Sequence, residues 1–282
     1  MEILNGIELS EKLLAELKPA VDSFALKPRL DIVFIGQNEA SQVYVNKKIA
    51  AGEFLGIKVV VHSFLKSTTE EILELVKDLA NDSEVHGIII QLPAPDIDTE
   101  KIFPLIPVEK DVDGLNPKTL GNIYHGDLSI VPATVRGIIY VFEHIAQKQN
   151  LSLKDFLSGK NVLIANRSLI IGKPLMGVLN KYNVTCTMAH SKTENINDFV
   201  GAADIIVLGT GSKVELDYSL LKKGVVLIDA GFNKKGKKIE GDVSAEKLNP
   251  NVAYLSPVPN GIGPLGVAFL LINTFEAFKK LS

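Results

Sequence analysis

The chain has 282 residues, of which 46% are hydrophobic and 22% charged, and its formal net charge is −3. This length exceeds that of a usual single core and predicts two domains, while the balanced charge gives no electrostatic case for a nucleic-acid partner. No apolar run approaches the roughly 20 residues that span a bilayer, and the start at Met1–Asn5 lacks the regions of a signal peptide. We therefore expect a globular protein of the cytoplasm that does not bind membranes.

The first part of the chain alternates predicted helices with apolar strands. Helical patterns cover 9–17, a segment ending near Gly56, and 72–80, while apolar runs predict strands at 30–35, 58–64 and 87–92. Thr68 or Thr69, followed by two glutamates, predicts an N-capped start for the third of these helices. Strands that are apolar throughout and alternate with helices indicate a parallel sheet covered on both faces.

Two polar side chains of the second predicted helix stand out as candidates for chemistry. Tyr44 and Lys48 are four residues apart, so they lie on one helical face, which Ser41 shares. The helix follows a strand whose carboxyl end is where open α/β sheets bind ligands. Gln91 ends the third strand at the same edge, and prolines 93 and 95 then fix a rigid turn. The alternative is a solvated lysine, a half-buried tyrosine and a glutamine that only solvates its own turn.

The segment 104–132 is predicted to be a loop and connector that carries two acids, Asp111 and Asp113. Two acids flanking one valine could suggest a metal, but no histidine or further acid cluster supports one. The five histidines are scattered without ligand spacing. The sequence therefore predicts no metal site. The single cysteine, Cys186, lies in an apolar run, so we expect it to pack in the core rather than to act as a nucleophile.

The second half predicts a nucleotide-binding domain. A long apolar helix at 135–147 precedes strands at 161–165, 184–188, 204–208, 225–229 and near 251–255, and a final helix covers 267–280. A strand, a loop at Asn166–Pro174 and a helix from Leu175 form the setting of a dinucleotide fold. The G-x-G-x-x-G fingerprint is absent, so the pattern of letters alone is a weak signal.

Charge indicates which dinucleotide binds. In NAD-type folds an acid about 20 residues after the glycine loop binds the ribose 2′-hydroxyl, but here the second strand ends in His190, Ser191 and Lys192. Arg167 stands on the first loop, and guanidinium and ammonium groups both pair with phosphate oxygens. The sequence therefore favours NADP over NAD. The alternative is that Arg167 and Lys192 are ordinary surface cations.

Five motifs in this order resemble one family. They are Ser41-x-x-Tyr44-x-x-x-Lys48, Gln91-Leu92-Pro93-Ala94-Pro95, Lys110-Asp111-Val112-Asp113-Gly114, Arg167-Ser168-x-x-x-Gly172-Lys173-Pro174 and Pro257-Val258-Pro259-x-Gly261-x-Gly263-Pro264. Together, over essentially the whole chain, they resemble the bifunctional methylenetetrahydrofolate dehydrogenase/methenyltetrahydrofolate cyclohydrolase family. The resemblance implies a folate substrate, one-carbon metabolism that supplies purine biosynthesis, and a homodimer formed through the second domain.

The resemblance also implies a two-domain α/β fold with a cleft between the domains. We expect a parallel α/β catalytic domain at 1–136 with 266–282, because the last helix returns to it, and a Rossmann-like NADP-binding domain at 137–265. It assigns the cofactor site to Asn166, Arg167, Ser168, Ser191, Gly211 and Ile228. The turn 208–212 would let backbone approach the ribose or the nicotinamide.

The same resemblance distributes roles around the folate. Asp113 would hydrogen-bond the pterin ring while Asp111 orders the loop, and the loop with Pro259 and Gly261 would line the folate. Hydride transfer needs mainly positioning, whereas water attack on the methenyl cation needs a base. We expect that base to be Lys48 with a low pKa. Gln91 would orient its amine, and Tyr44 would supply a ring face for the aminobenzoyl group and a hydroxyl.

Five positions depart from the family pattern: Ala133, Val135, Asn166, Asn260 and Gly266. Asn166 stands where glycine is usual. Asparagine tolerates a positive φ better than other non-glycine residues, but its side chain would approach the pyrophosphate and weaken the cofactor. Two alternatives stay open: a shikimate-type dehydrogenase, which would not need Gln91 or Asp113, and a non-catalytic binding paralogue.

Overall fold

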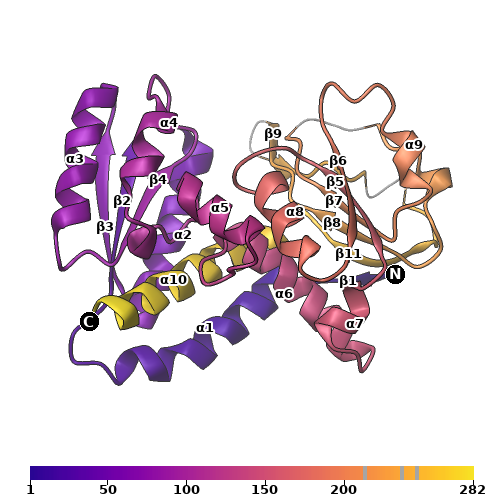
Figure 1. Ribbon diagram of the computed structural model, residues 1–282, viewed down its shortest axis with the longest axis horizontal. Coiled ribbons are helices and arrows are strands. Elements are labelled where there is room, and N and C mark those ends of the chain that lie inside the picture. The colour runs from indigo at the N-terminus through magenta and orange to yellow at the C-terminus, as the bar shows by residue number, and fades with distance from the viewer. Residues whose placement is uncertain (212–214, 236–237, 245–247) are drawn as a thin grey trace. The chain divides into compact units, whose positions relative to one another are not determined.

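The computed structural model describes residues 1–211, 215–235, 238–244 and 248–282. It divides into two compact units (Figure 1). Unit 1 comprises Met1–Leu9 with Thr134–Gly266, and unit 2 comprises Ser10–Ala133 with Val267–Ser282. The predicted two-domain α/β class is confirmed. The predicted domain bounds placed the first nine residues with the catalytic domain, whereas the compact units group them with Thr134–Gly266.

The elements have the following bounds. The strands are β1 Glu2–Ile3, β2 Arg29–Ile35, β3 Lys58–Phe64, β4 Gly87–Gln91, β5 Asn161–Ala165, β6 Thr185–Ala189, β7 Ile205–Leu208, β8 Val225–Asp229, β9 Asn233–Lys235, β10 Lys238–Glu240 and β11 Val252–Ser256. The α-helices are α1 Gly6–Asp22, α2 Glu39–Leu55, α3 Thr69–Asn81, α4 Thr99–Ile102, α5 Pro117–Tyr124, α6 Ala133–Lys148, α7 Leu153–Leu157, α8 Gly172–Asn180, α9 Asn197–Val200 and α10 Ile262–Leu281. Short 3₁₀ turns are η1 Phe103–Leu105, η2 Val108–Lys110 and η3 Tyr218–Leu220.

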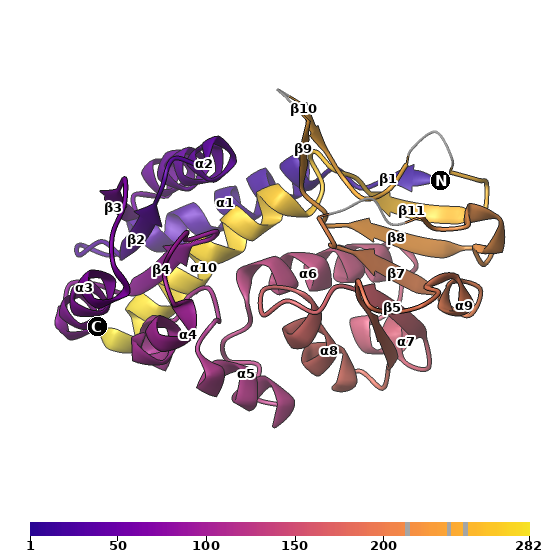
Figure 2. The ribbon, with the colours of Figure 1, turned by 90° about the horizontal axis from the view of Figure 1, so that it is seen from above.

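Unit 2 is built on a parallel sheet in the order β3-β2-β4. Helix α2 lies on one face of this sheet and α3 on the other (Figure 2), as right-handed crossovers in opposite directions require. Helix α3 begins with the predicted cap, since Thr68 and Glu71 form a reciprocal capping box. The central strand β2 is buried along almost its whole length, so the sheet forms the core of the unit.

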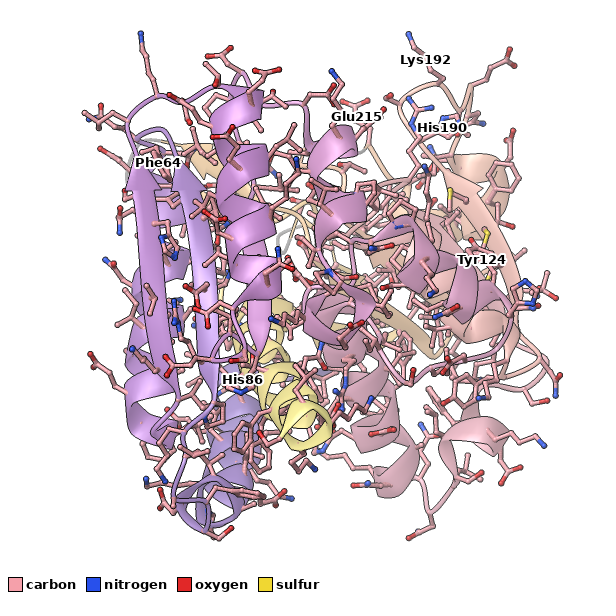
Figure 3. The ribbon with its side chains drawn as sticks, turned by 60° about the vertical axis from the view of Figure 1, so that its left-hand side comes forward. Phe64, His86, Tyr124, His190, Lys192 and Glu215 are labelled. Carbon is pink, nitrogen blue, oxygen red and sulfur yellow. The ribbon has the colours of Figure 1, made fainter. Side chains whose placement is uncertain are left out.

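A buried acid interrupts this apolar strand near its amino end. Asp31 is fully buried, and its carboxylate accepts hydrogen bonds from Arg29 Nη2 at 2.9 Å and pairs with His62 Nε2 at 2.7 Å. The hydrogen bond to Asp31 is the largest cause that raises the pKa of Arg29. At this end of the sheet His86 precedes β4, while Phe64 marks the opposite, carboxyl end (Figure 3). The cluster therefore lies away from the edge that carries Gln91.

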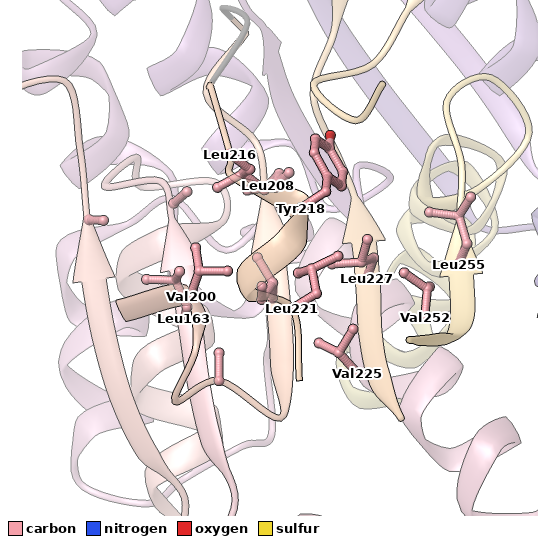
Figure 4. Packing of buried hydrophobic residues seen from close by; sticks show 14 residues of the cluster. Leu163, Val200, Leu208, Leu216, Tyr218, Leu221, Val225, Leu227, Val252 and Leu255 are labelled. Carbon is pink, nitrogen blue, oxygen red and sulfur yellow. The ribbon is translucent and has the colours of Figure 1, made fainter. Parts of the chain in front are cut away.

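Unit 1 contains a six-stranded sheet in the order β1-β11-β8-β7-β5-β6, parallel throughout. One face of the sheet carries a cluster of buried side chains (Figure 4). The short strand β1 pairs with β11, and Leu4 N donates to Leu255 O at 2.8 Å. These bonds explain why the first nine residues group with unit 1.

Several elements differ from the sequence prediction. The segment 104–132 is not only a connector, because α5 begins there after Asn116, whose side chain caps the amide of Lys118. Helix α7, strand β1 and the antiparallel pair β9–β10 were also not predicted. Helix α10 begins at Ile262 rather than at 267, since Pro264 lies in the first turn, where a helix needs no amide donor.

Helix α10 corrects the expectation that no apolar segment is long enough to span a bilayer. By length and composition alone it is apolar enough to cross a membrane, but 67% of the relevant window is buried inside the protein. Asn273 on this helix donates to the carbonyls of Val112 at 2.7 Å and Val131 at 3.1 Å. Its apolar surface is thus explained by packing in a core.

Candidate active site

Helix α2 presents the predicted pair of side chains. Asn38 caps its start by accepting from the amide of Ser41 at 3.0 Å, and Gly56 ends it with a φ of 76° that favours glycine. Tyr44 and Lys48 therefore lie one turn apart on the same helical face. Both residues are half-buried, so they are not simply solvated.

The structure brings Lys48 and Gln91 into direct contact. Lys48 Nζ donates to Gln91 Oε1 at 2.8 Å. Gln91 Nε2 donates in turn to the carbonyl of Leu92 at 2.9 Å, which also accepts from Ser41 Oγ at 3.3 Å. The amide of Gln91 is thus oriented with its oxygen toward the lysine. This contact joins α2 to the carboxyl end of β4, as the shared edge predicted.

Burial shifts the pKa values of the side chains in this group. Burial is the largest cause that lowers the pKa of Lys48, and the nearby carboxylate of Asp113 partly opposes it. Burial likewise raises the pKa of Asp113, and Lys48 opposes that shift. The charge of each residue therefore shifts the pKa of the other. The downward direction for Lys48 agrees with the sequence expectation, because a neutral amine is the form that can accept a proton. Burial also raises the pKa of Tyr44.

The two acids of the connector have different environments. Asp111 is 1% exposed, and its carboxylate accepts from the amides of Leu115 at 3.0 Å and Asn116 at 2.9 Å and from Thr119 Oγ1 at 2.6 Å. These bonds are what the predicted loop-ordering role requires. Asp113 is more exposed than Asp111, and its charge interacts with that of Lys48.

A buried lysine that sequence reasoning missed orders the same connector. Lys110 is 7% exposed, and its Nζ donates to the carbonyls of Ala80 at 2.8 Å and Asp82 at 2.7 Å. These carbonyls lie at the carboxyl end of α3, where cations are stabilised by the helix dipole. Burial is the largest cause that lowers its pKa. Lys110 therefore ties the loop that carries Asp113 to α3.

The loop after β5 in unit 1 is organised by Asn166. Its Oδ1 accepts from Ser168 N at 2.8 Å, Ser168 Oγ at 2.8 Å and Gly172 N at 2.9 Å, and its Nδ2 donates to the carbonyl of Gly209. Asn166 is not among the residues with a positive φ, whereas Asn260 is, at 74°. The backbone argument made for Asn166 thus applies to Asn260. The side-chain oxygen and nitrogen of Asn166 both make hydrogen bonds within the protein.

The residues that were predicted to select NADP are accessible. Arg167 and Ser191 are exposed, and His190 and Lys192 project from the loop that follows β6 (Figure 3). The amide of Lys192 donates to His190 Nδ1 at 3.2 Å. This loop presents hydroxyl, imidazole and ammonium groups, and no acid follows β6 until Glu194. The side chains that are present therefore fit a phosphate better than a neutral ribose.

The remaining predicted residues are spread over unit 1. Gly211 follows β7 with a φ of 64°, and the neighbouring Ser212 lies outside the described residues. Ile228 is fully buried in β8, so its predicted part in the cofactor site stays a prediction that concerns its backbone. Pro259 and Gly261 belong to the loop before α10, where the Val258–Pro259 peptide is cis. Their assignment to the folate stays a prediction.

Two further acids, Asp229 and Asp242, were not predicted as functional, although both are buried close to the cofactor loops. Cys186 is half-buried and burial raises the pKa of its thiol to about 11, which does not suit a nucleophile. Over 1–211, 215–235, 238–244 and 248–282, no group of three metal-ligating side chains comes together.

Comparison with known proteins identifies the family. The family model for the catalytic domain of tetrahydrofolate dehydrogenase/cyclohydrolase matches residues 4–113, and that for its NAD(P)-binding domain matches residues 132–282. The chain belongs to this family. The Bifunctional protein FolD of Rickettsia bellii is 39% identical to it over 99% of both chains.

Solved structures of enzymes from this family are similar to the chain over nearly its whole length. The FolD methylenetetrahydrofolate dehydrogenase/cyclohydrolase of Campylobacter jejuni is 33% identical with a TM-score of 0.90 over 99% of both chains. The enzyme from Trypanosoma brucei, complexed with NADP and an inhibitor, is 28% identical with a TM-score of 0.89 over 99% of this chain and 97% of its own.

Membership in the family confirms the predicted enzyme class. The protein is a bifunctional enzyme that oxidises methylenetetrahydrofolate with a nicotinamide cofactor and hydrolyses methenyltetrahydrofolate. The alternative of a shikimate-type dehydrogenase loses its basis, because both halves of the chain match models of the folate family.

Proposed function

We propose that Lys48, assisted by Gln91 and Asp113, carries the hydrolytic reaction, and that the dehydrogenase reaction uses NADP. The hydrogen bond between Lys48 and Gln91, made by a lysine whose pKa is lowered by burial, is the observation that carries the proposal. A neutral amine beside a strand-end amide has the properties of a general base.

Lys48 would act on water. The methenyl carbon is cationic, so a protonated lysine beside it would be repelled, whereas a neutral amine can take the proton that the attacking water loses. Because Gln91 uses its oxygen to accept from Lys48 and its nitrogen to donate to Leu92, it fixes the position of Nζ. The lone pair of the amine is then left for water.

Tyr44 and Asp113 would bind the folate. The carboxylate of Asp113 can accept two hydrogen bonds from the amino-pyrimidine edge of the pterin, and its electrostatic interaction with Lys48 supports a role in the same site. The ring of Tyr44 lies one helical turn before Lys48, which suits a face-on contact with the aminobenzoyl group. Pro259 and Gly261 remain proposed contributors through the backbone of their loop.

The cofactor would be held by unit 1. Arg167 would pair with the 2′-phosphate with help from Ser191, while Asn166, Ser168 and Gly211 shape the loops beneath it. When bound, the nicotinamide ring accepts the hydride from the folate methylene group. The product is a resonance-stabilised cation, so the protein supplies no base for this step, and its part is to hold the two rings in register.

Four wider assignments are part of the proposal. The domain bounds 1–136 with 266–282 for folate and 137–265 for NADP follow the resemblance, as does a homodimer formed through the second domain. A cytoplasmic location and a supply of one-carbon units to purine biosynthesis fit the composition and the reactions.

One set of assays tests the proposal. Purified protein is mixed with methylenetetrahydrofolate and either NADP or NAD, and formation of the reduced cofactor is followed by absorbance. Methenyltetrahydrofolate is supplied separately and its loss is recorded. We expect both activities, with NADP preferred. A protein that binds folate but performs neither reaction would be the non-catalytic paralogue and would refute the proposal.

A further inference from the structure

Two buried carboxylates stand behind the cofactor loops of unit 1 and have no assigned role. Asp229 ends strand β8 and is 1% exposed, and Asp242 follows strand β10 and is 4% exposed. Buried acids are retained only when hydrogen bonds or charges compensate for lost solvation. Their partners therefore show what these two side chains hold in place.

Asp229 holds the backbone that carries Asp242. Its Oδ1 accepts from the amides of Gly231 at 2.9 Å and Asp242 at 3.1 Å, and its Oδ2 accepts from Val243 at 2.8 Å. Burial is the largest cause that raises the pKa of Asp229, and these hydrogen bonds oppose it. A Cβ on Gly241 would lie 1.9 Å from Asp229 Oδ2, so only glycine allows this close approach.

Asp242 in turn holds the turn that follows β7. Its Oδ2 accepts from Thr210 N at 2.6 Å and from Thr210 Oγ1 at 3.0 Å, and its Oδ1 accepts from Asn233 Nδ2 at 2.9 Å. Each of these partners can donate, and the two oxygens of the Asp242 carboxyl group accept from them. Removing it would leave the Thr210 amide without this partner, which costs more than the bond itself contributes.

The turn held in this way is the predicted cofactor turn. Thr210 and Gly211 come one residue after the end of β7, at the carboxyl edge where parallel sheets bind ligands. From the other side, Asn166 Nδ2 donates to the carbonyl of Gly209. Two side chains from distant segments therefore fix one turn, and one of them, Asn166, already belongs to the first cofactor loop.

We infer that Asp242 is a positioning residue for hydride transfer, acting through the Thr210–Gly211 turn on the placement of the cofactor. The inference rests on the proposed cofactor site. A misplacement of about 1 Å at a reacting centre can reduce a rate by about 100-fold. Water attack on the methenyl cation uses Lys48 and no hydride acceptor, so loss of Asp242 should separate the two activities of the enzyme.

The experiment compares four variants of the full chain with the wild type. Asp242→Ala removes the carboxylate, Asp242→Asn keeps one accepting oxygen, and Thr210→Val removes only the hydroxyl contact. The matched control is Asp204→Asn. Asp204 also accepts from a backbone amide, that of Asn161 at 2.9 Å, and from Lys222 Nζ at 2.5 Å, but it lies at the amino end of β7.

Each variant is measured for NADPH binding by fluorescence titration, for kcat and KM in both reactions, and for its melting temperature. For Asp242→Ala we expect NADPH to bind about 10- to 100-fold more weakly, the scale of one or two charged hydrogen bonds. The dehydrogenase kcat should fall at saturating cofactor as well, while the hydrolytic kcat stays within about 2-fold of the wild-type value. Asp242→Asn and Thr210→Val should show smaller losses in the same direction, and Asp204→Asn none.

Two outcomes overturn the inference: unchanged NADPH binding and dehydrogenase activity in folded Asp242→Ala, or an equal fall of both activities. If Asp242→Ala does not fold, Asp242→Asn and Thr210→Val decide, and wild-type NADPH binding by both refutes the positioning role. Failure of the proposed function looks different, because the wild type itself would then lack the reactions. NADPH binding by the variants remains readable in that case.

Discussion

Replacing Lys48 with methionine removes the ammonium group while keeping an unbranched side chain of similar length. In the wild type, Nζ donates to Gln91 Oε1 at 2.8 Å, and burial lowers the pKa of the lysine. Because the group that accepts the proton from water is then gone, we expect the hydrolytic rate to fall by about 100- to 10,000-fold.

The dehydrogenase activity of the same variant should fall much less. Hydride transfer requires alignment of the rings and no proton acceptor at the reacting carbon. The loss is then that of one positioning hydrogen bond to Gln91, roughly 1 kcal/mol, or about 5-fold in rate. Gln91→Ala should reduce the hydrolytic rate in the same way as Lys48→Met but to a smaller extent. Water that enters the place of the Gln91 side chain raises the pKa of Lys48 and so moves the pH profile of hydrolysis to higher pH.

The assay records both reactions from pH 6 to pH 10 for the wild type, Lys48→Met and the control Lys77→Met, which changes an exposed lysine on α3. The wild-type hydrolytic rate should rise with pH as Lys48 loses its proton, and this rise should be absent in Lys48→Met. Circular dichroism and melting temperatures check the fold. Hydrolysis near the wild-type rate in folded Lys48→Met would show that Lys48 is not the base.

Four further changes have defined outcomes. Arg167→Ala should weaken the binding of NADP by roughly 1.5–3 kcal/mol, the scale of a charged hydrogen bond, and should barely affect the binding of NAD. Equal losses for both cofactors in titrations would show that Arg167 does not bind the 2′-phosphate. Asp113→Ala should raise the folate KM in both reactions and, because its charge opposes the lowering of the Lys48 pKa, should move the hydrolysis profile to lower pH. Asp111→Ala should mainly lower the melting temperature, since its carboxylate orders the loop, and a larger effect on folate than that of Asp113→Ala would reverse the assignment. Asn166→Gly should reduce the free energy of unfolding by about 1 kcal/mol, as for loss of a helix cap, and should weaken the binding of NADPH. Tighter NADPH binding would show that the side chain obstructs the cofactor.

The sequence predicted best those features that depend on neighbours along the chain. Strands β3, β5 and β8 have the predicted bounds, since each is an apolar run between turn residues. The contact of Lys48 with Gln91 was also predictable, because the strand before α2 and the strand that Gln91 ends leave their sheet at the same edge. These inferences need only periodicity and a general rule about parallel sheets.

What the sequence did not predict depends on long-range contacts or on polar composition. Asp242 accepts a hydrogen bond from Thr210, which lies 32 positions earlier in the chain, and no local sequence pattern predicts such a pair. Helix α5 has only eight residues in a segment with many turn-forming residues, and β9 is rich in lysine. Asn166 was correctly marked as unusual, but the hydrogen bonds that its side chain makes to the loop were not predicted, because a side chain that satisfies loop amides cannot be told from one that points to a ligand by its position alone.

The division of the chain into units also has a consequence for synthesis. Each unit consists of two separate segments, and all three boundaries fall inside helices: after Leu9 in α1, after Ala133 in α6 and after Gly266 in α10. A chain that emerges from the ribosome with its amino end first can therefore complete unit 1 before unit 2, which waits for Val267–Ser282. Unit 2, although most of it is made first, is the last to acquire its full core.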